Sequence, residues 1–368
     1  MGLIPNLLHM NPRKPSGIKE IARLAKVSIG TVDRVLHNRK GVAASTRARV
    51  LRIIEQTGYT KNITASRLKL ASTHRIRIAI LIPEISEPWS YWRLQQNGIE
   101  KAAAELKELG VTVAYFYFDV NKPADFRKKW QKIRTADFQA VVTVPFLKKA
   151  VTQLLEEAEV HHVQVVFLDT ERPLLGKACF IRQNSYDAGR VAGRLLYGLV
   201  GEQGHYLVVN LLRDAKIQIN CQQREEGFRS FFKENAPHLL PQLHTLNHPL
   251  NTDELLAGVL EPFVKPERPL GIFVSSARAF MVAGALRHFP HSKTFLAGFD
   301  LNQQNIACLK KGEIHFIIHQ KPEYQGYTAV KSIYNHLVHE EAPAVKVDIP
   351  IEIIVKENLP SYIHREWA

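Results

Sequence analysis

Polar side chains of different chemistry share one face of a short predicted helix in the stretch SIGTVDRVLHN, residues 28–38. Helical spacing places Gly30, Asp33, Arg34 and His37 on this face. The remaining, apolar face consists of Ile29, Val32, Val35 and Leu36. Ser28 is a good N-cap, because its hydroxyl can accept a hydrogen bond from an otherwise unpaired backbone N–H. One face can therefore pack on neighbouring helices, and the other is free to hydrogen-bond with a ligand.

Basic residues are concentrated in the same part of the chain. The whole protein has 368 residues and a formal net charge of +14, and residues 1–75 contain 15 Lys or Arg against three acidic residues. A compact basic block suits binding to a phosphate backbone, because each neutralised phosphate releases condensed counterions. A solvated basic tail is the alternative that charge alone leaves open.

Two more short helices flank this stretch. Ile18, Ile21, Ala22 and Ala25 recur at helical spacing before it, and Val50, Ile53 and Ile54 do so after it, up to Gly58. Residues 17–60 thus predict a helix-turn-helix, whose second helix enters the major groove of DNA. A helix pair packed for structural reasons alone is the other interpretation of the pattern. Residues 1–16 form a Pro- and Asn-containing tail that we expect to be disordered.

The region 17–70 resembles the headpiece of the LacI/GalR family of bacterial transcription regulators. The resemblance rests on A-x-V-S-x-x-T-V-x-R-V-L-x-N, then V-x-x-x-T-R-x-x-V, then G-Y-x-x-N-x-x-A-x-x-L, all present in this sequence. It implies that Ile29 and Gly30 open the recognition helix, and that Arg34 contacts a base or a phosphate. Residues at positions that commonly contact the DNA backbone are Thr31, His37, Asn38, Thr46 and Arg47.

The family resemblance also implies a hinge helix within residues 61–75. In NITASRL, Asn62 opens the matching segment, and Leu68, with Ala65 beside it, corresponds to the leucine that is inserted into the minor groove. Such a wedge kinks the duplex at a cost of a few kcal/mol, which wider contact offsets.

Two positions depart from the family pattern. Lys61 replaces the usual proline, which leaves the hinge less preset, and Lys26 replaces the usual turn glycine. We expect an ordinary helical or mildly strained conformation at Lys26.

An aspartate is unexpected on a face that meets DNA. Asp33 either accepts a hydrogen bond from cytosine N4 or holds Arg34 or His37 in position. Gly30 permits a closer approach to the bases but removes a side chain that could contact them.

From about residue 76 onward, apolar strand-like runs alternate about seven times with amphipathic helical stretches. This alternation predicts an α/β core of two Rossmann-like lobes with parallel sheets, and the resemblance implies a periplasmic-binding-protein type I architecture. We place one lobe at about 76–183 and 313–343, and the other at about 184–312 and 344–368. A ligand is expected between the lobes, at the carboxyl ends of the strands.

Candidate ligand residues follow the predicted strands. The aromatic residues Trp89, Tyr91 and Trp92 could stack on a sugar ring, although one of the three could belong to the core. The resemblance marks further ligand positions, at Asp169, Gln183, Asn184, Gln222, Ser276, Asp300 and Gln320. Arg224 is either a ligand residue near Gln222 or a surface residue. Arg278 would favour an acidic sugar or a phosphate if it points inward, and otherwise lies on the surface.

Other function classes find little support. The three cysteines are widely spaced and predict neither a disulfide framework nor a zinc site, and 16 histidines lack a metal-binding pattern. No secretory signal, apolar run of membrane-spanning length, Walker A, G-x-S-x-G or zincin motif occurs, so we expect a cytoplasmic protein that is not an enzyme and holds no cofactor or metal. Asp169 and Asp300 could form an acid–base pair, but nothing places a nucleophile beside them.

These observations predict a regulator that binds operator DNA as a homodimer or tetramer and responds to a sugar-like effector. The alternatives are a sugar-binding or sugar-processing module with an accessory helix-turn-helix, and a regulator that answers to a protein co-regulator. The effector of such a regulator either releases the DNA or recruits it.

Overall fold

The computed structural model describes residues 17–36, 41–57, 59, 75–85, 90–171, 178–212, 218–250, 252, 254–339 and 346–363. The chain divides into two units, Met1–Leu70 and Ala71–Ala368. The expected tail at 1–16 and hinge helix at 61–75 lie outside the described residues, apart from Arg75.

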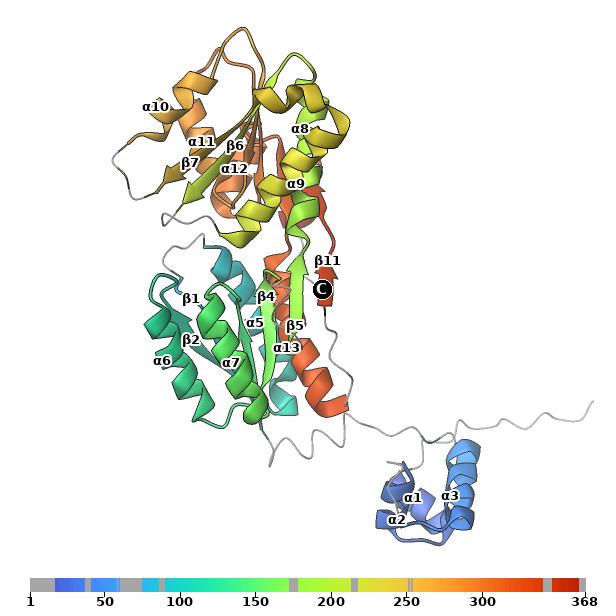
Figure 1. Ribbon diagram of the computed structural model, residues 1–368. Helices are drawn as coiled ribbons and strands as arrows, with labels where there is room; N and C mark the ends of the chain where they lie inside the picture. Colours follow the sequence, from blue (N-terminus) through green and yellow to red (C-terminus); the bar gives the residue numbers. More distant parts are fainter. Residues whose placement is uncertain are drawn as a thin grey trace, which may run out of the picture. The chain divides into compact units, whose positions relative to one another are not determined.

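The described residues of the first unit form three helices around a small core (Figure 1). Their bounds are α1 (Ile18–Ala25), α2 (Ile29–Leu36) and α3 (Ala44–Thr57). Ile21, Ala25, Val32 and Val50 are almost completely buried between them. The residues that recur at helical spacing in the sequence thus form this core, except for Ile29.

Ile29 differs from the expectation, whereas Lys26 adopts the strained one of the two expected conformations. The side chain of Ile29 is 46% exposed, so it does not belong to the apolar face of α2 that packs on α1 and α3. Lys26 ends α1 in the left-handed conformation, with φ 51° and ψ 47°. The backbone N–H of Lys26 donates to the carbonyl oxygens of Ala22 and Arg23 and so caps the helix. These hydrogen bonds offset the cost of a left-handed conformation for a residue with a Cβ.

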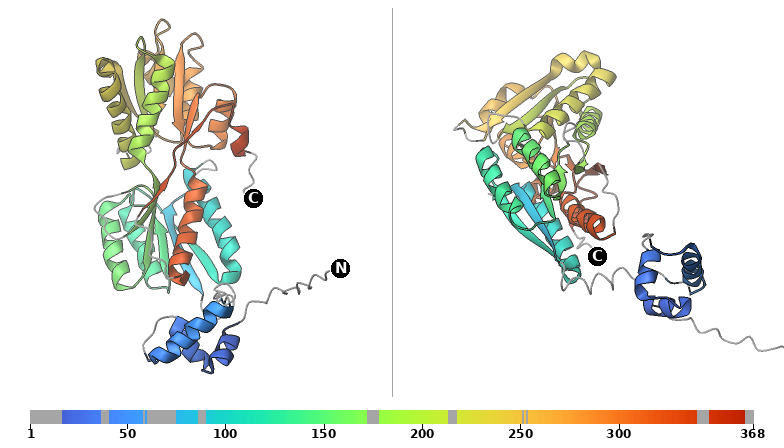
Figure 2. Two further views of the ribbon diagram at one scale, coloured as in Figure 1. Left: turned by 90° about the vertical axis from the view of Figure 1, so that its right-hand side faces the viewer. Right: turned by 60° about the horizontal axis from the view of Figure 1, so that its bottom comes forward.

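The second unit contains two six-stranded sheets, one in each lobe (Figures 1 and 2). The first sheet has the order β11-β5-β4-β3-β1-β2 and is entirely parallel. Its strands are β1 (Ile76–Pro83), β2 (Val111–Phe118), β3 (Ala140–Thr143), β4 (Gln164–Asp169), β5 (Cys179–Gln183) and β11 (Lys346–Ile349).

The second sheet has the order β12-β10-β9-β8-β6-β7, in which only β12 is antiparallel. Its strands are β6 (His205–Leu212), β7 (Leu243–Pro249), β8 (Leu270–Val274), β9 (Thr294–Phe299), β10 (Phe316–His319) and β12 (Glu352–Ile354). The expected two-lobed parallel α/β fold is confirmed.

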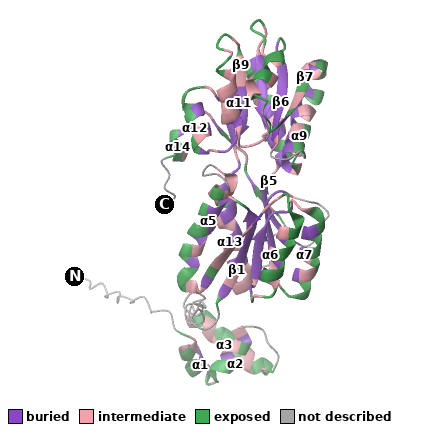
Figure 3. Ribbon diagram, turned by 90° about the vertical axis from the view of Figure 1, so that its left-hand side faces the viewer, coloured by how far each residue is buried: buried purple, intermediate pink, exposed green. Residues whose placement is uncertain are grey.

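Helices cover both faces of each sheet, so the central strands are buried almost throughout (Figure 3). In the first lobe, α5 (Tyr91–Leu106) packs beside α13 (Pro322–His339), and α6 (Pro123–Arg134) packs beside α7 (Lys148–Val160). In the second lobe, the helices are α8 (Ser185–Val200), α9 (Ile219–Asn235), α10 (Leu256–Leu260), α11 (Ala279–Leu286), α12 (Gln303–Lys310) and α14 (Pro360–Ile363). Short 3-10 helices occupy Lys107–Leu109, Pro237–Gln242 and Glu261–Phe263.

The chain crosses between the lobes after β5, after β10 and after β11. The boundaries that we expected at about 313 and 344 therefore need correction. β10 pairs with β9 in the second lobe, so residues 313–319 do not belong to the first lobe. β11 pairs with β5, which places 346–349 in the first lobe. Short strands at a crossover can join either sheet, and only pairing decides between them.

Glycines let the two helices of each pair approach closely. A Cβ on Gly189 of α8 would lie 1.9 Å from the carbonyl oxygen of Arg224 in α9. A Cβ on Gly326 of α13 would lie 2.2 Å from the carbonyl oxygen of Gln95 in α5. Backbone contact within each helix pair thus fixes the positions of α9 and α13.

Candidate nucleic-acid interface and ligand cavity

The start of α2 has the predicted cap. The Ser28 Oγ accepts a hydrogen bond from the backbone N–H of Thr31 at 3.1 Å and lies 2.9 Å from Thr31 Oγ1. Both side chains are thereby held at the helix N-terminus. The backbone N–H groups and partial positive charge of such an end are suited to a phosphate.

The predicted DNA-contacting face of α2 is accessible. Ser28, Ile29, Gly30 and Arg34 are exposed, and Thr31 and Asp33 are half-buried. Thr46 and Arg47, in the first turn of α3, are also half-buried. Five further candidates lie outside the described residues: His37, Asn38, Asn62, Ala65 and Leu68.

A cavity of about 170 Å³ lies between the lobes, at the carboxyl ends of strands from both sheets. Eight sequence-predicted ligand residues line it: Tyr91, Trp92, Asp169, Arg224, Ser276, Arg278, Asp300 and Gln320. They come from the ends of β4, β8, β9 and β10 and from α5 and α9. The cavity thus lies where we expected a ligand, at the carboxyl ends of the strands.

Two aspartates, one in each lobe, anchor the polar wall of the cavity. Asp169 accepts hydrogen bonds from Thr170 Oγ1 at 2.8 Å and from Asn220 Nδ2 at 3.2 Å. Because Asp169 ends β4 of the first lobe and Asn220 belongs to α9 of the second, the latter bond joins the lobes directly.

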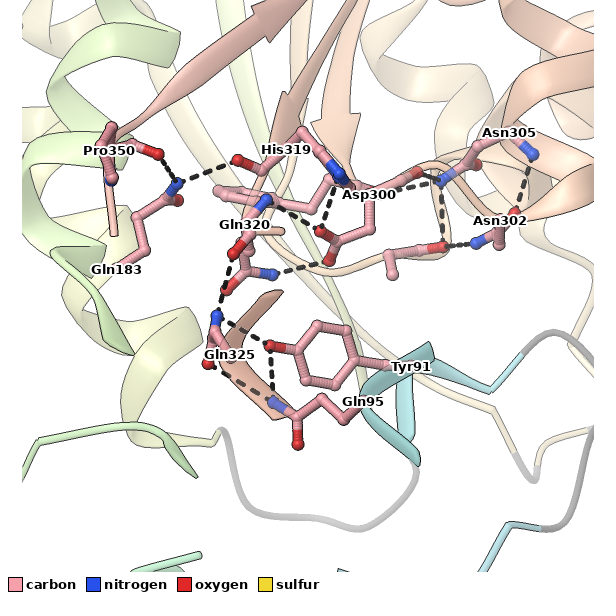
Figure 4. A network of polar contacts seen from close by, with 12 residues as sticks. Tyr91, Gln95, Gln183, Asp300, Asn302, Asn305, His319, Gln320, Gln325 and Pro350 are labelled. Carbon is pink, nitrogen blue, oxygen red and sulfur yellow. Dashed lines mark hydrogen bonds and ion pairs between the residues drawn. The ribbon is translucent and has the colours of Figure 1, made fainter. Parts of the chain in front are cut away.

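Asp300 forms the corresponding contacts with the crossover after β10. Its carboxylate accepts from the backbone N of Gln320 at 3.1 Å and from Gln320 Nε2 at 2.6 Å (Figure 4). Asn305 Nδ2 donates to the carbonyl oxygens of Phe299 and Asp300, at 2.8 and 3.0 Å. These bonds hold the turn in which Asp300 has a φ of 62°; Asp169 has a φ of 72°. Both carboxylates are thus presented from left-handed, strained positions, as is common at binding sites.

Arg224 crosses the floor of the cavity and is only 3% exposed. It donates from Nη1 to the carbonyl oxygen of Ser275 at 2.7 Å and from Nη2 to Gln320 Oε1 at 2.5 Å. Its guanidinium carbon lies 3.8 Å from the centre of the Phe299 ring. Its Nε has no hydrogen-bond partner among the described residues, and neither has Ser276 Oγ. A ligand oxygen can supply these missing acceptors or donors.

Burial sets the protonation chemistry of the cavity. Burial raises the pKa of Asp169 above its usual value, although Arg224, Thr170 and Tyr91 act to lower it. Burial, together with the negative charges of Asp169 and Asp300, raises the pKa of Tyr91 well above its usual value. Tyr91 therefore presents a neutral hydroxyl at neutral pH.

An aromatic wall faces these polar groups. Trp92 packs edge-to-face on Tyr91 and on Phe146, with ring centres 5.2 and 5.6 Å apart, and all three residues line the cavity. A wall of this kind can cover the C–H face of a sugar ring.

Family models match nearly all of the described chain. The lacI family of bacterial regulatory proteins matches residues 17–62, and the periplasmic binding protein domain matches residues 78–341. The chain belongs to the lacI family.

Individual relatives agree with this membership. The HTH-type transcriptional regulator DegA of Bacillus subtilis is 24% identical over 218 residues, which is 59% of this chain and 60% of DegA. The chain thus spans less than two thirds of the length of this lacI-family relative. The name describes DegA as a regulator, not an enzyme.

Solved structures share the fold of the second unit. A putative LacI transcriptional regulator from Bacteroides fragilis aligns with a TM-score of 0.71 at 23% identity, covering 79% of this chain and 100% of that one. An ABC transporter solute-binding protein from Burkholderia graminis, in complex with D-arabinose, aligns with a TM-score of 0.65 at 20% identity, covering 78% of this chain and 97% of that one.

Three family-derived ligand candidates do not line the cavity. Gln183 donates to the carbonyl oxygens of His319 and Pro350, at 3.0 and 3.3 Å, and so ties the three crossovers together. Asn184 caps α8 by accepting from the backbone N of Asp187. Gln222 is exposed on α9. Trp89 lies outside the described residues.

Sequence reasoning missed several residues that line the cavity. Asn220 lies four residues before Arg224 and therefore on the same face of α9, a spacing that could have identified it. Phe118 and Phe146 also line the cavity, but a phenylalanine after an apolar strand is not distinguishable from a core residue.

Neither a membrane span nor a metal-binding cluster is present in the described part of the chain. No helix there is long and apolar enough to cross a bilayer. No group of three or more His, Cys, Asp or Glu side chains there could hold a metal ion. The three cysteines are buried and free.

Proposed function

We propose that the protein is a transcriptional regulator that binds operator DNA through α2 and is controlled by a sugar-like ligand between its lobes. The observation that carries this proposal is the combination of an accessible recognition face with an interlobe cavity lined by paired carboxylates, a guanidinium and aromatic rings. A homodimer on a pseudo-palindromic operator is the assembly that such a headpiece uses.

The chemistry of the cavity favours a polyol. Hydroxyl groups both donate and accept hydrogen bonds, so they can serve the Asp169 and Asp300 carboxylates as well as Arg224. An apolar ligand would leave such groups unpaired, at about 1 to 3 kcal/mol each. D-arabinose in the related solute-binding protein supports this choice.

One observation favours a second candidate ligand class. Arg278, Ser276 and Arg224 all line the cavity. Arginine pairs readily with carboxylate or phosphate, so a sugar acid or a phosphorylated sugar is the second candidate.

A ligand between the lobes would be linked to DNA binding. It would add bonds to both lobes, as the contact between Asn220 and Asp169 already does. The angle between the lobes would in turn set the separation of the two headpieces of a dimer. Ligand and operator would therefore change one another's affinity by the same factor.

DNA binding can be tested by gel shift with the full chain and the DNA upstream of its own gene, at two salt concentrations. We expect sequence-specific binding that weakens steeply with salt, since phosphate contacts dominate the affinity. Arg34→Ala should weaken binding, and Lys107→Ala, in the ligand-binding unit, should not. Equal affinity for all DNA sequences would contradict the proposal.

The ligand class can be tested by thermal shift with neutral sugars, sugar acids and phosphorylated sugars. A ligand at 100 times its dissociation constant stabilises the folded protein by about 2.7 kcal/mol. We expect neutral sugars to raise the melting temperature. If only apolar or amino-acid ligands did so, the sugar proposal would be wrong.

A further inference from the structure

A buried glutamine outside the cavity joins the ligand-facing groups to the crossover. Gln325 of α13 is completely buried and does not line the cavity. Its Oε1 accepts from the backbone N of Asp169 at 3.2 Å and from Gln95 Nε2 at 3.4 Å. Its Nε2 donates to the carbonyl oxygen of Gln320 at 2.9 Å and to Tyr91 OH at 3.4 Å (Figure 4).

The backbone partners fix the orientation of this amide. The N–H of Asp169 can only donate, and the carbonyl of Gln320 can only accept. If the amide were reversed, an N–H would face an N–H and an oxygen would face an oxygen. Gln325 therefore forms hydrogen bonds at the same time to a backbone group of the first lobe, at Asp169, and to a backbone group of the crossover, at Gln320.

The tyrosine hydroxyl extends the network into the cavity. Tyr91 OH accepts hydrogen bonds from Gln95 Nε2 at 3.2 Å and from Gln325 Nε2 at 3.4 Å, and it lines the cavity together with Asp169. Since its two acceptor positions are used, its own proton is left to donate to another acceptor. Gln325 thus bonds two residues that line the cavity, Asp169 at its backbone and Tyr91 at its hydroxyl.

The helix that carries Gln325 cannot shift easily. The neighbouring Gly326 lies against the backbone of Gln95, where an added Cβ would come within 2.2 Å of a carbonyl oxygen. The amide is therefore held against α5 by backbone contact as well as by its own hydrogen bonds.

We propose that Gln325 is a positioning residue, which holds Asp169 and Tyr91 in their ligand-binding arrangement and ties that arrangement to the crossover at Gln320. A ligand that displaces Asp169 or Tyr91 then also displaces the crossover at Gln320, because the same amide bonds all three residues. This inference rests on the proposed ligand-binding function of the cavity, although the network itself can be tested without a ligand.

The test uses hydrogen exchange of the full chain without ligand, resolved at the amide of Asp169. Gln325→Met keeps the volume and removes the amide, and we expect exchange at Asp169 to become at least about 10-fold faster. Gln96→Met is the matched control, because Gln96 is a buried glutamine of the same lobe that bonds Glu100 and Tyr117 away from the cavity. Unchanged exchange in Gln325→Met, or an equal acceleration in Gln96→Met, would overturn the proposal.

A conservative variant adds a pH signature that loss of packing would not give. Protonated glutamic acid can both donate and accept as glutamine does, whereas glutamate can only accept. In Gln325→Glu, a carboxyl oxygen can accept from the Asp169 amide at any pH, so we expect that amide to stay protected. The bond donated to the Gln320 carbonyl is lost on deprotonation, so the free energy of unfolding of Gln325→Glu should fall relative to that of wild type as the pH rises through the pKa of the introduced carboxyl group. A free energy of unfolding that depends on pH in the same way as that of the wild type would contradict the role of the donated bond.

A titration with D-arabinose, or with whichever sugar raises the melting temperature, separates the two proposals. We expect Gln325→Met to bind that sugar at least about 10-fold more weakly than Gln96→Met does. Equal affinity of the two variants would overturn the positioning role. If no sugar binds the wild type, the ligand proposal fails, and the exchange measurements alone decide about Gln325.

Discussion

At the scale of single residues, two positions in the helix-turn-helix unit show how the sequence sets local structure. Lys26 adopts a left-handed conformation that a glycine adopts without strain, and Asp33 is half-buried on the face of α2 that also exposes Arg34. A substitution at either position should therefore change a property that can be measured.

Replacing Lys26 with glycine should stabilise the helix-turn-helix unit. The left-handed conformation costs a residue with a Cβ roughly 1 kcal/mol, which Lys26→Gly would recover in part. Urea unfolding, followed by circular dichroism, measures the difference. Lys26→Ala is the matched control, because alanine keeps the Cβ and should give no such gain; equal stabilisation by both variants would refute the explanation.

Asp33→Ala should change operator preference more than overall affinity. If Asp33 accepts from a cytosine or orients Arg34, its loss should alter selection at one base pair by about 1 to 3 kcal/mol. Binding to a set of operators with single base changes measures this. Uniformly tighter binding to all of them would mean that Asp33 only repels phosphate.

The buried carboxyl of Asp169 should make stability depend on pH. Because burial raises its pKa in the folded protein, this carboxyl destabilises the fold increasingly as the pH rises from its usual pKa to the raised one. The stability of Asp169→Asn relative to wild type should therefore increase with pH across that window. Urea unfolding at several pH values tests this, and a constant or falling difference would contradict the raised pKa.

At the scale of elements, the closely packed helices α8 and α9 position the guanidinium of the cavity. Gly189 lies against the carbonyl of Arg224, whereas a Cβ added to Gly198, in the same helix α8, would meet no neighbouring atom of the described residues within 4 Å. The two glycines thus provide a matched pair.

Gly189→Ala should destabilise the ligand-binding unit by about 1 to 3 kcal/mol, because the two helices must separate to admit the methyl group. Gly198→Ala should instead stabilise α8 by about 0.5 to 1 kcal/mol, since alanine is the better helix former. Thermal unfolding distinguishes the two. Equal effects of the two substitutions would contradict the close packing.

The helices and strands also show which parts of the fold could be predicted from the sequence. Strand–helix alternation predicted two parallel lobes and a cavity at the strand ends, because burial on both faces leaves a clear apolar pattern. It misassigned β10 and β11, since four-residue strands at a crossover carry no signal of which sheet they join. That Gln183 bonds the crossovers and does not line the cavity was unpredictable for a related reason, because its partners are carbonyls of the other two crossovers, far away in the sequence.

At the scale of the whole molecule, the proposed regulator has two units whose binding equilibria would be linked. The accessible face of α2 would bind the operator, and the interlobe cavity would bind a sugar-like ligand. The bond between Asn220 and Asp169 shows that residues of both lobes meet at the cavity wall, where a ligand would join them further.

The most direct test measures operator affinity of the full chain with and without a saturating concentration of the sugar identified by thermal shift. We expect operator affinity to change by about 5- to 150-fold, with little change for unrelated DNA. Arg224→Met, which removes the central cation of the cavity, should abolish this change. Saturating sugar that leaves operator affinity unchanged would contradict the linkage.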